Sequence, residues 1–229
     1  IGAYLSAPNG SASGNTYVVF GKKGNNSPVQ LSDIADGDGG FVINGESRND
    51  YSGGSVSSAG DVNGDGLSDL IIGAKGSNHS GEGSGSSYVV FGKKGKTAVE
   101  LSEVAAGRGG FIIKGESMYD QSGWSVSSAG DVNRDGLSDL IIGSPFADFN
   151  GDSSGSSYVI YGKRNDTTPV ELSDIANGNG GYVIYGQAED NRSGASVSSA
   201  GDVNGDGWSD LIVGAYGANS YAGSSYVLL

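Results

Sequence analysis

The sequence predicts an all-β protein of the β-propeller class, built of blades of about 70 residues. A nine-residue acidic segment occurs three times, at spacings of 70 and 71 residues. Each repeated unit holds four short apolar runs separated by turns rich in Gly and Ser. No stretch keeps the 3.6-residue apolar period of a helix. Four strands per unit at a fixed spacing are typical of a propeller blade.

The elements follow in the same order in each unit. In the middle unit the expected strands cover residues 125–129, 140–142, 157–161 and 182–185. Runs such as Tyr17-Val-Val-Phe20 do not alternate polar and apolar residues, so we expect sheets covered on both faces. Between the third and fourth strands, residues 172–176 are expected to form one helical turn with Ser173 as its N-cap.

The expected units are about 1–54, 55–124, 125–195 and 196–229, within a single propeller domain. The first unit begins in its second strand and the last ends after its third, which gives about 3.25 repeats. Three arrangements stay open: a piece of a larger propeller, an oligomer that completes a ring, and a small ring of four blades. Open sheet edges at both ends would favour self-association.

The repeated acidic segments cover residues 61–69, 131–139 and 202–210. Oxygen-bearing side chains occupy positions 1, 3, 5 and 9, and Gly occupies position 6, where a chain that wraps an ion needs a sharp turn. These residues are Asp61, Asn63, Asp65, Asp69, Asp131, Asn133, Asp135, Asp139, Asp202, Asn204, Asp206 and Asp210. Oxygen donors without thiol or imidazole suit Ca²⁺, so we expect about three Ca²⁺ per chain.

Two other interpretations of these segments fail on the sequence. An EF-hand needs an acidic residue at position 12 and flanking helices, but position 12 is Ile72, Ile142 or Val213 within an apolar run. A simple Asn-Gly or Asp-Gly turn does not explain the Asp at positions 1 and 9. Three clustered carboxylates would repel one another without a cation.

Composition limits the partners and the compartment. The chain has 229 residues, 43 of them Gly, no Cys, and a formal charge of −13, which argues against nucleic acid and anionic membranes. No run of 18 apolar residues predicts a membrane span. No signal peptide is visible and the sequence does not begin with Met, so we expect an excised or mature piece. Calcium loops without disulfides favour an extracellular or cell-surface bacterial protein.

No catalytic site is expected. His79 is the single His, lies in a Ser/Gly loop, and has no counterpart in other units, so we expect a surface residue. Without Cys, nucleophilic triads are nearly excluded. The basic pairs after each third strand are expected to be solvated charges that discourage edge pairing, namely Lys22-Lys23, Lys93-Lys94 and Lys163-Arg164.

Three residues break the repeat. Trp124 replaces Gly54 and Ala195, and packing between blades is favoured over ligand stacking. Trp208 lies inside the third acidic loop, where it is expected to shield the ion. Arg134 stands at position 4 of the second loop, where its charge should weaken cation binding.

The unit resembles the FG-GAP repeat of integrin α-subunit propellers and their bacterial relatives. The FG position is Ser-Gly at residues 52, 122 and 193, and the GAP position holds Gly73-Ala-Lys, Gly143-Ser-Pro and Gly214-Ala-Tyr. Both motifs are degenerate, whereas the calcium loop between them is intact. The resemblance implies a further ligand, the backbone carbonyl at position 7, supplied by Leu67, Leu137 and Trp208.

The same resemblance implies a non-enzymatic, structural or adhesive module that displays loops to a protein or glycan partner. Two alternatives stay open. One is a lectin-like or accessory domain of a secreted enzyme. The other is an idealised repeat protein without a natural ligand, which the near-identity of the units allows.

Overall fold

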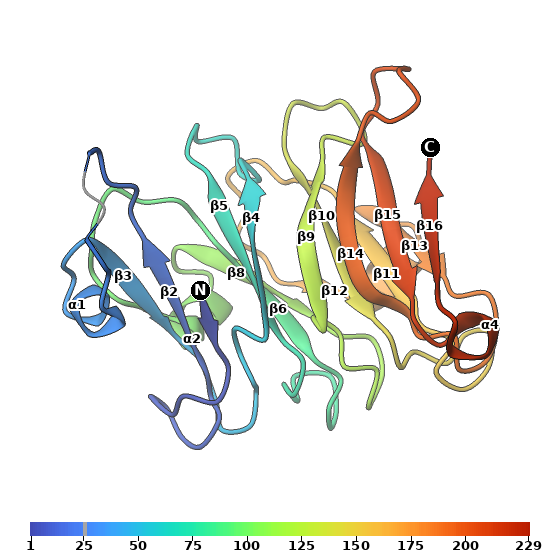
Figure 1. Cartoon of the computed structure of the whole chain (residues 1–229), viewed down its shortest axis with the longest axis horizontal. Coiled ribbons are helices and arrows are strands. Elements are labelled where there is room, and N and C mark those ends of the chain that lie inside the picture. The colour runs from blue at the N-terminus through green and yellow to red at the C-terminus, as the bar shows by residue number, and fades with distance from the viewer. Residues whose placement is uncertain (25–26) are drawn as a thin grey trace.

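The computed structural model describes residues 1–24 and 27–229, and within these residues the strands form four sheets that follow one another in chain order. Figure 1 shows the first and last sheets at opposite ends of the molecule. The first sheet contains β1 (Gly2–Ala3), β2 (Asn15–Val19) and β3 (Gly40–Asn44). The second contains β4 (Ser55–Gly60), β5 (Asp69–Ala74), β6 (Ser86–Val90) and β8 (Gly110–Lys114).

The remaining sheets repeat this plan. The third contains β9 (Ser125–Gly130), β10 (Asp139–Ser144), β11 (Ser156–Ile160) and β13 (Gly181–Tyr185). The fourth contains β14 (Ser193–Gly201), β15 (Asp210–Ala215) and β16 (Ser224–Leu228). Successive strands pair antiparallel in each sheet. This confirms the predicted propeller blades, with two four-stranded units flanked by three-stranded ends.

The hydrophobic cores lie between neighbouring sheets. On β5, Ile71 faces the core shared with the third sheet, whereas Ile72 faces the core shared with the first. Adjacent residues of a strand point to opposite faces, so an unbroken apolar run fills two cores at once. β6 and β11 are accordingly buried along their whole length, whereas β16 at the end of the row is largely exposed.

Short helices connect the third and fourth strands of the units. They are α1 (Leu31–Ala35), α2 (Leu101–Ala105) and α3 (Leu172–Ala176). The helical turn at 172–176 is confirmed, but the N-cap prediction was wrong. The N-cap of α3 is Glu171, which makes no capping side-chain bond, and Ser173 lies inside the helix. Burial of Leu172 and Ile175 holds the turn against its sheet. A distorted turn, α4 (Ala218–Tyr221), precedes β16.

Two very short strands were not foreseen. β7 (Val99–Glu100) pairs in parallel with β3, and β12 (Val170–Glu171) pairs in parallel with β8. Each belongs to one unit but adds to the outer edge of the preceding sheet. The Glu171 carboxylate also forms an ion pair with the Lys114 ammonium, with 2.7 Å between Nζ and Oε1. Neighbouring blades therefore share backbone hydrogen bonds as well as apolar cores.

Candidate calcium loops and surface clefts

The three acidic loops connect the first and second strands of three units. They project from the same edge of the molecule, at the top in Figure 1, beside β5, β10 and β15. The ninth loop residue is in each case the first residue of the second strand. The register of that strand therefore fixes the last predicted ligand of each loop.

In the first loop, the Asp61 carboxylate organises the turn. Its Oδ1 accepts the N–H groups of Gly64 at 2.8 Å and Asp65 at 3.1 Å. Its Oδ2 accepts the Gly66 N–H at 2.9 Å. Position 6 needs Gly because its φ is +84°, a region that side chains with a Cβ disfavour. The chain is thus wrapped around the Asp61 oxygens, which accept backbone N–H groups of the loop.

The other side chains of this loop bond locally. Asn63 Oδ1 accepts the Asp65 N–H at 2.8 Å, and Asp65 Oδ1 accepts the Leu67 N–H at 2.8 Å. Asp69 is fully buried, and its two oxygens accept the N–H groups of Val62 and Gly92. Burial raises the pKa of Asp69, opposed by those two hydrogen bonds and reinforced by nearby carboxylates.

The second and third loops repeat this pattern. Asp131 accepts the Asp135 and Gly136 N–H groups, and Asp202 accepts those of Asp206 and Gly207. Burial also raises the pKa of Asp139. In each loop the position-3 side chain accepts the position-5 N–H, whereas the position-9 carboxylate accepts the position-2 N–H. The position-7 residues close the turn through their N–H groups, which bond the position-5 carboxylates.

The donor chemistry of the loops fits a hard cation such as Ca²⁺, because it consists of carboxylate and amide oxygens only. In addition, Asp210 Oδ1 is buried without a hydrogen-bond partner. Across the described residues, however, no three Asp, Glu or His side chains meet in a metal-binding arrangement. The ligand assignment therefore stays a prediction.

Two arginines contact acidic loops of other units in a way that the sequence did not indicate. The Arg134 guanidinium lies over the Trp208 ring, 3.6 Å from its centroid, and its Nη2 donates to the Asp206 carbonyl at 3.3 Å. Arg164 Nη1 donates to the Gly64 carbonyl at 3.4 Å. The Arg134 side chain thus contacts the third loop although its backbone belongs to the second. Only long-range packing could reveal this contact.

The lysines after the third strands correct another expectation. Lys93 and Lys163 are not simply solvated charges, because each lies over a Phe ring of the preceding sheet. Their ammonium nitrogens are 4.4 Å from the Phe41 centroid and 4.2 Å from the Phe111 centroid. These contacts help to hold neighbouring blades together. Lys22, Lys23, Lys94 and Arg164 are exposed, as predicted.

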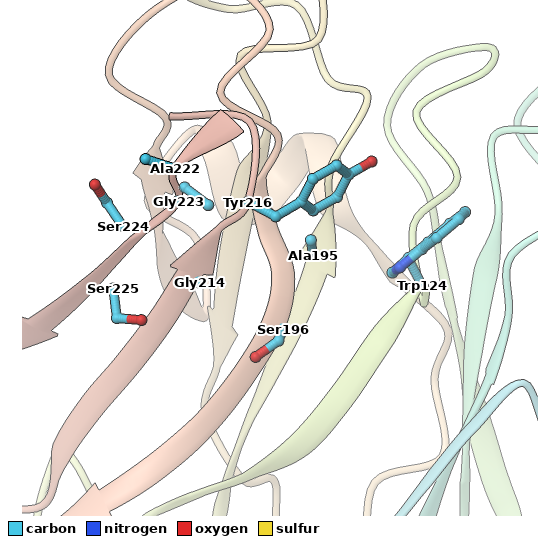
Figure 2. Close-up of a pocket in the computed structure, with 10 residues that line it drawn as sticks. Trp124, Ala195, Ser196, Gly214, Tyr216, Ala222, Gly223, Ser224 and Ser225 are labelled. Atoms are coloured by element: carbon cyan, nitrogen blue, oxygen red, sulfur yellow. The ribbon is translucent and has the colours of Figure 1, made fainter. Parts of the chain in front are cut away.

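Trp124 is half-buried and packs between blades, as predicted. Its ring meets Phe146 edge-on at 5.4 Å, and the Lys75 ammonium lies 3.7 Å from its centroid. It also borders a cavity of about 560 Å³ on the open face of the fourth sheet. Figure 2 shows Trp124 and Tyr216 beside the small residues that line this cavity.

The blade interfaces explain this cavity. A Cβ added to Gly73 or Gly143 would collide with the carbonyl of Gly123 or Gly194, in the Ser-Gly turn where the chain enters the next sheet. Gly214 is the equivalent residue of the fourth sheet, and there the atoms nearest to an added Cβ belong to Ser196, with Oγ at 3.3 Å. The cavity therefore lies where the second and third sheets contact the Ser-Gly turn that leads into the following sheet.

The sheets and their repeated acidic loops define a repeat protein of the β-propeller type. The FG-GAP repeat family matches residues 52–90, 122–160 and 193–228. The chain is accordingly an FG-GAP repeat protein of the integrin type, which confirms the resemblance drawn from the motifs.

Individual relatives agree with this assignment. Integrin alpha-5 of Xenopus laevis is 34% identical over 120 residues, which cover 49% of this chain and 10% of the relative. Integrin alpha-6 of Homo sapiens is 32% identical over 108 residues, or 45% and 8% of the two chains. Phosphatidylinositol-glycan-specific phospholipase D of Rattus norvegicus is 36% identical over 114 residues, or 48% and 13%. The chain thus matches about a tenth of the length of these relatives.

The described residues contain no helix with the length and apolar character needed to cross a membrane.

Proposed function

We propose that this chain is an extracellular, calcium-stabilised propeller domain that acts as a structural or adhesive protein-interaction module. Its units are residues 1–54, 55–124, 125–195 and 196–229. The observation that carries the proposal is the near-identical wrapping of three oxygen-rich loops at one edge of the molecule. Loops of this kind are useful where free Ca²⁺ is about millimolar, which is outside cells.

In each loop the ion would be held by the side chains at positions 1, 3, 5 and 9 and by the carbonyl at position 7. When bound, Ca²⁺ would supply the positive charge that offsets the clustered carboxylates. The loop residues themselves fix the turn and set the register of the second strand. The role is structural, and no catalytic residue is proposed.

Calcium titration calorimetry on chelator-stripped protein tests this role. We expect about three Ca²⁺ per chain and a higher melting temperature in calcium than in chelator. Absence of calcium binding would reduce the three segments to turns and would overturn the proposal.

The open face of the fourth sheet supports a second proposal, which concerns assembly. The same surface in the other sheets is covered by the next blade, so we propose that this face packs against another blade of the same repeat type. Light scattering over a range of concentrations tests whether a second copy supplies it. A monomer whose Trp124 emission changes saturably with a defined sugar would instead favour the glycan-binding alternative.

A further inference from the structure

A second kind of cleft lies at the end of the blades opposite the acidic loops. β10 runs from Asp139 in the acidic loop to Ser144, and the cleft is formed by residues that follow Ser144 and by the connection between β8 and β9. It is a cavity of about 430 Å³ between the second and third sheets, here called the aromatic cleft. Its polar and aromatic wall is formed by Glu116, Asp120, Asp148, Phe149, Tyr158 and Tyr185.

The equivalent cleft one blade earlier shows what such a site needs. There Tyr88 Oη donates to Glu46 Oε2 at 2.6 Å, and His79 Nε2 lies 3.2 Å from the same oxygen. The hydrogen bond with Glu46 raises the pKa of His79, which favours the imidazolium. The protein therefore places a cationic side chain of its own beside the Glu46 carboxylate.

The aromatic cleft keeps the tyrosine and the glutamate but loses the cation. Tyr158 Oη donates to Glu116 Oε2 at 2.7 Å, just as Tyr88 does to Glu46. Phe149 replaces His79 and stacks on Tyr185, with ring centroids 3.6 Å apart and an interplanar angle of 12°. Asp148 replaces Asn78 and adds a negative charge. No Lys, Arg or His is among the described residues that line the cleft.

Asp120 is the group that most needs a partner. The residue is only 6% exposed, and its Oδ2 accepts the Ser117 N–H at 3.2 Å. Asp120 lines the cleft, and the hydrogen bond from Ser117 engages only one of its two carboxylate oxygens. The Asp120 carboxylate can therefore accept further donors from a group bound in the cleft.

We propose that the aromatic cleft binds an aliphatic ammonium group, such as the end of a lysine side chain or a small primary amine. Acidic side chains of the cleft can accept N–H donors of an ammonium, while Phe149 and Tyr185 offer ring surface to its methylene groups. A volume of about 430 Å³ accommodates a group of this size. The carboxylates do not meet in a metal-binding arrangement, which favours an organic cation over a metal.

The next blade junction has different chemistry. Gln187 replaces Glu116 and Asn191 replaces Asp120, so the two acids become neutral amides. Ammonium binding is thereby assigned to one junction of the chain. It does not depend on calcium in the acidic loops, which lie at the other end of the strands.

Calorimetric titration of the full chain with n-butylamine tests the proposal, with n-butanol as the neutral probe of the same shape. We expect one saturable amine site per chain and no saturable binding of the alcohol. Asp120→Asn should weaken amine binding at least tenfold. Asp50→Asn, in the equivalent cleft one blade earlier, should leave it unchanged. Equal binding to the wild type and Asp120→Asn, or no saturable binding to the wild type, would overturn the proposal.

A second pair of variants separates binding from folding. Phe149→His, which copies the first cleft, should abolish amine binding while the circular dichroism spectrum and melting temperature remain close to those of the wild type. His79→Phe combined with Asn78→Asp should create a second amine site. Retention of amine binding by a folded Phe149→His protein would contradict the proposed cation position.

Discussion

The guanidinium of Arg134 lies 3.6 Å from the ring centroid of Trp208 and joins two acidic loops that are 71 residues apart in the chain. Arg134 has a φ of +60°, where the first and third loops have Gly64 and Gly205 at +76° and +79°. The Arg backbone is therefore held in a conformation that usually favours Gly. The contact with Trp208 offsets part of that strain.

Replacement of Arg134 by Gly should therefore change stability by less than about 1 kcal/mol, because strain relief and the lost contact oppose each other. Calcium affinity should rise, since a positive charge is removed from between two cation loops. Calorimetry in calcium measures the affinity, and Trp208 emission in a Trp124→Phe background reports the lost contact. Arg134→Lys keeps the charge and is the control. An unchanged affinity in Arg134→Gly would show that the charge does not reach the ions.

Removal of a loop carboxylate should remove one ion. Asp135→Ala is expected to reduce the calcium stoichiometry from about three to about two and to lower the melting temperature in calcium. The difference in melting temperature between calcium and chelator should become smaller, because one of the three sites no longer binds an ion. Asp152→Ala is the matched control, because Asp152 is exposed and lies outside the acidic loops, in the connection between β10 and β11. Undiminished stoichiometry in Asp135→Ala would contradict the ligand assignment.

Asp120 should make stability depend on pH. Burial raises its pKa from 3.8 to about 7, and the charges of Asp148 and Glu116 add to the effect. The folded state thus binds the proton more tightly than the unfolded state does. The resulting stabilisation is full below about pH 4 and is lost as the pH rises through about 7.

Asp120→Asn should therefore stabilise the protein at pH 8 by about 1–2 kcal/mol, after allowance for solvent screening at the cleft mouth. Asn191 already occupies the equivalent position in the next unit. Urea unfolding of both proteins at pH 4 and pH 8, without amine, provides the measurement. A stability difference that is the same at both pH values would exclude Asp120 as the titrating group.

A methyl group at the blade interface should reveal which faces are covered. Gly143→Ala would drive its Cβ into the Gly194 carbonyl and should destabilise the protein by about 1–3 kcal/mol. Gly214→Ala would place its Cβ nearest to Ser196, with Oγ at 3.3 Å, and should be nearly neutral in a monomer. Thermal unfolding of both variants tests this. If the two variants were equally destabilised, another blade would already cover the fourth sheet in solution.

The parts predicted from sequence were those set by local periodicity. The runs around Ile71 and Ile141 could be assigned to doubly covered strands, and the Gly at loop position 6 to a sharp turn, because neighbouring residues determine both. The contacts of Arg134, Lys163 and Phe149 could not be predicted. Arg134 and Lys163 each depend on a partner in another blade, and Phe149 depends on Tyr185, which is distant in the sequence within its own blade. These contacts are set by packing and not by neighbouring residues. The parallel pairing of β12 could not be predicted either, because a strand of two residues carries no periodic signal.

The parallel pairing of β7 and β12 has a mechanical consequence. Because each of these strands is covalently part of one blade and hydrogen-bonded to the blade before it, a pull on the chain ends loads these bonds before a whole sheet can detach. Each blade is thus hydrogen-bonded to the blade before it, so tension should be borne by these strand pairs rather than by an unpaired linker. A module of this kind is suited to transmit force from the first sheet of the row to the last.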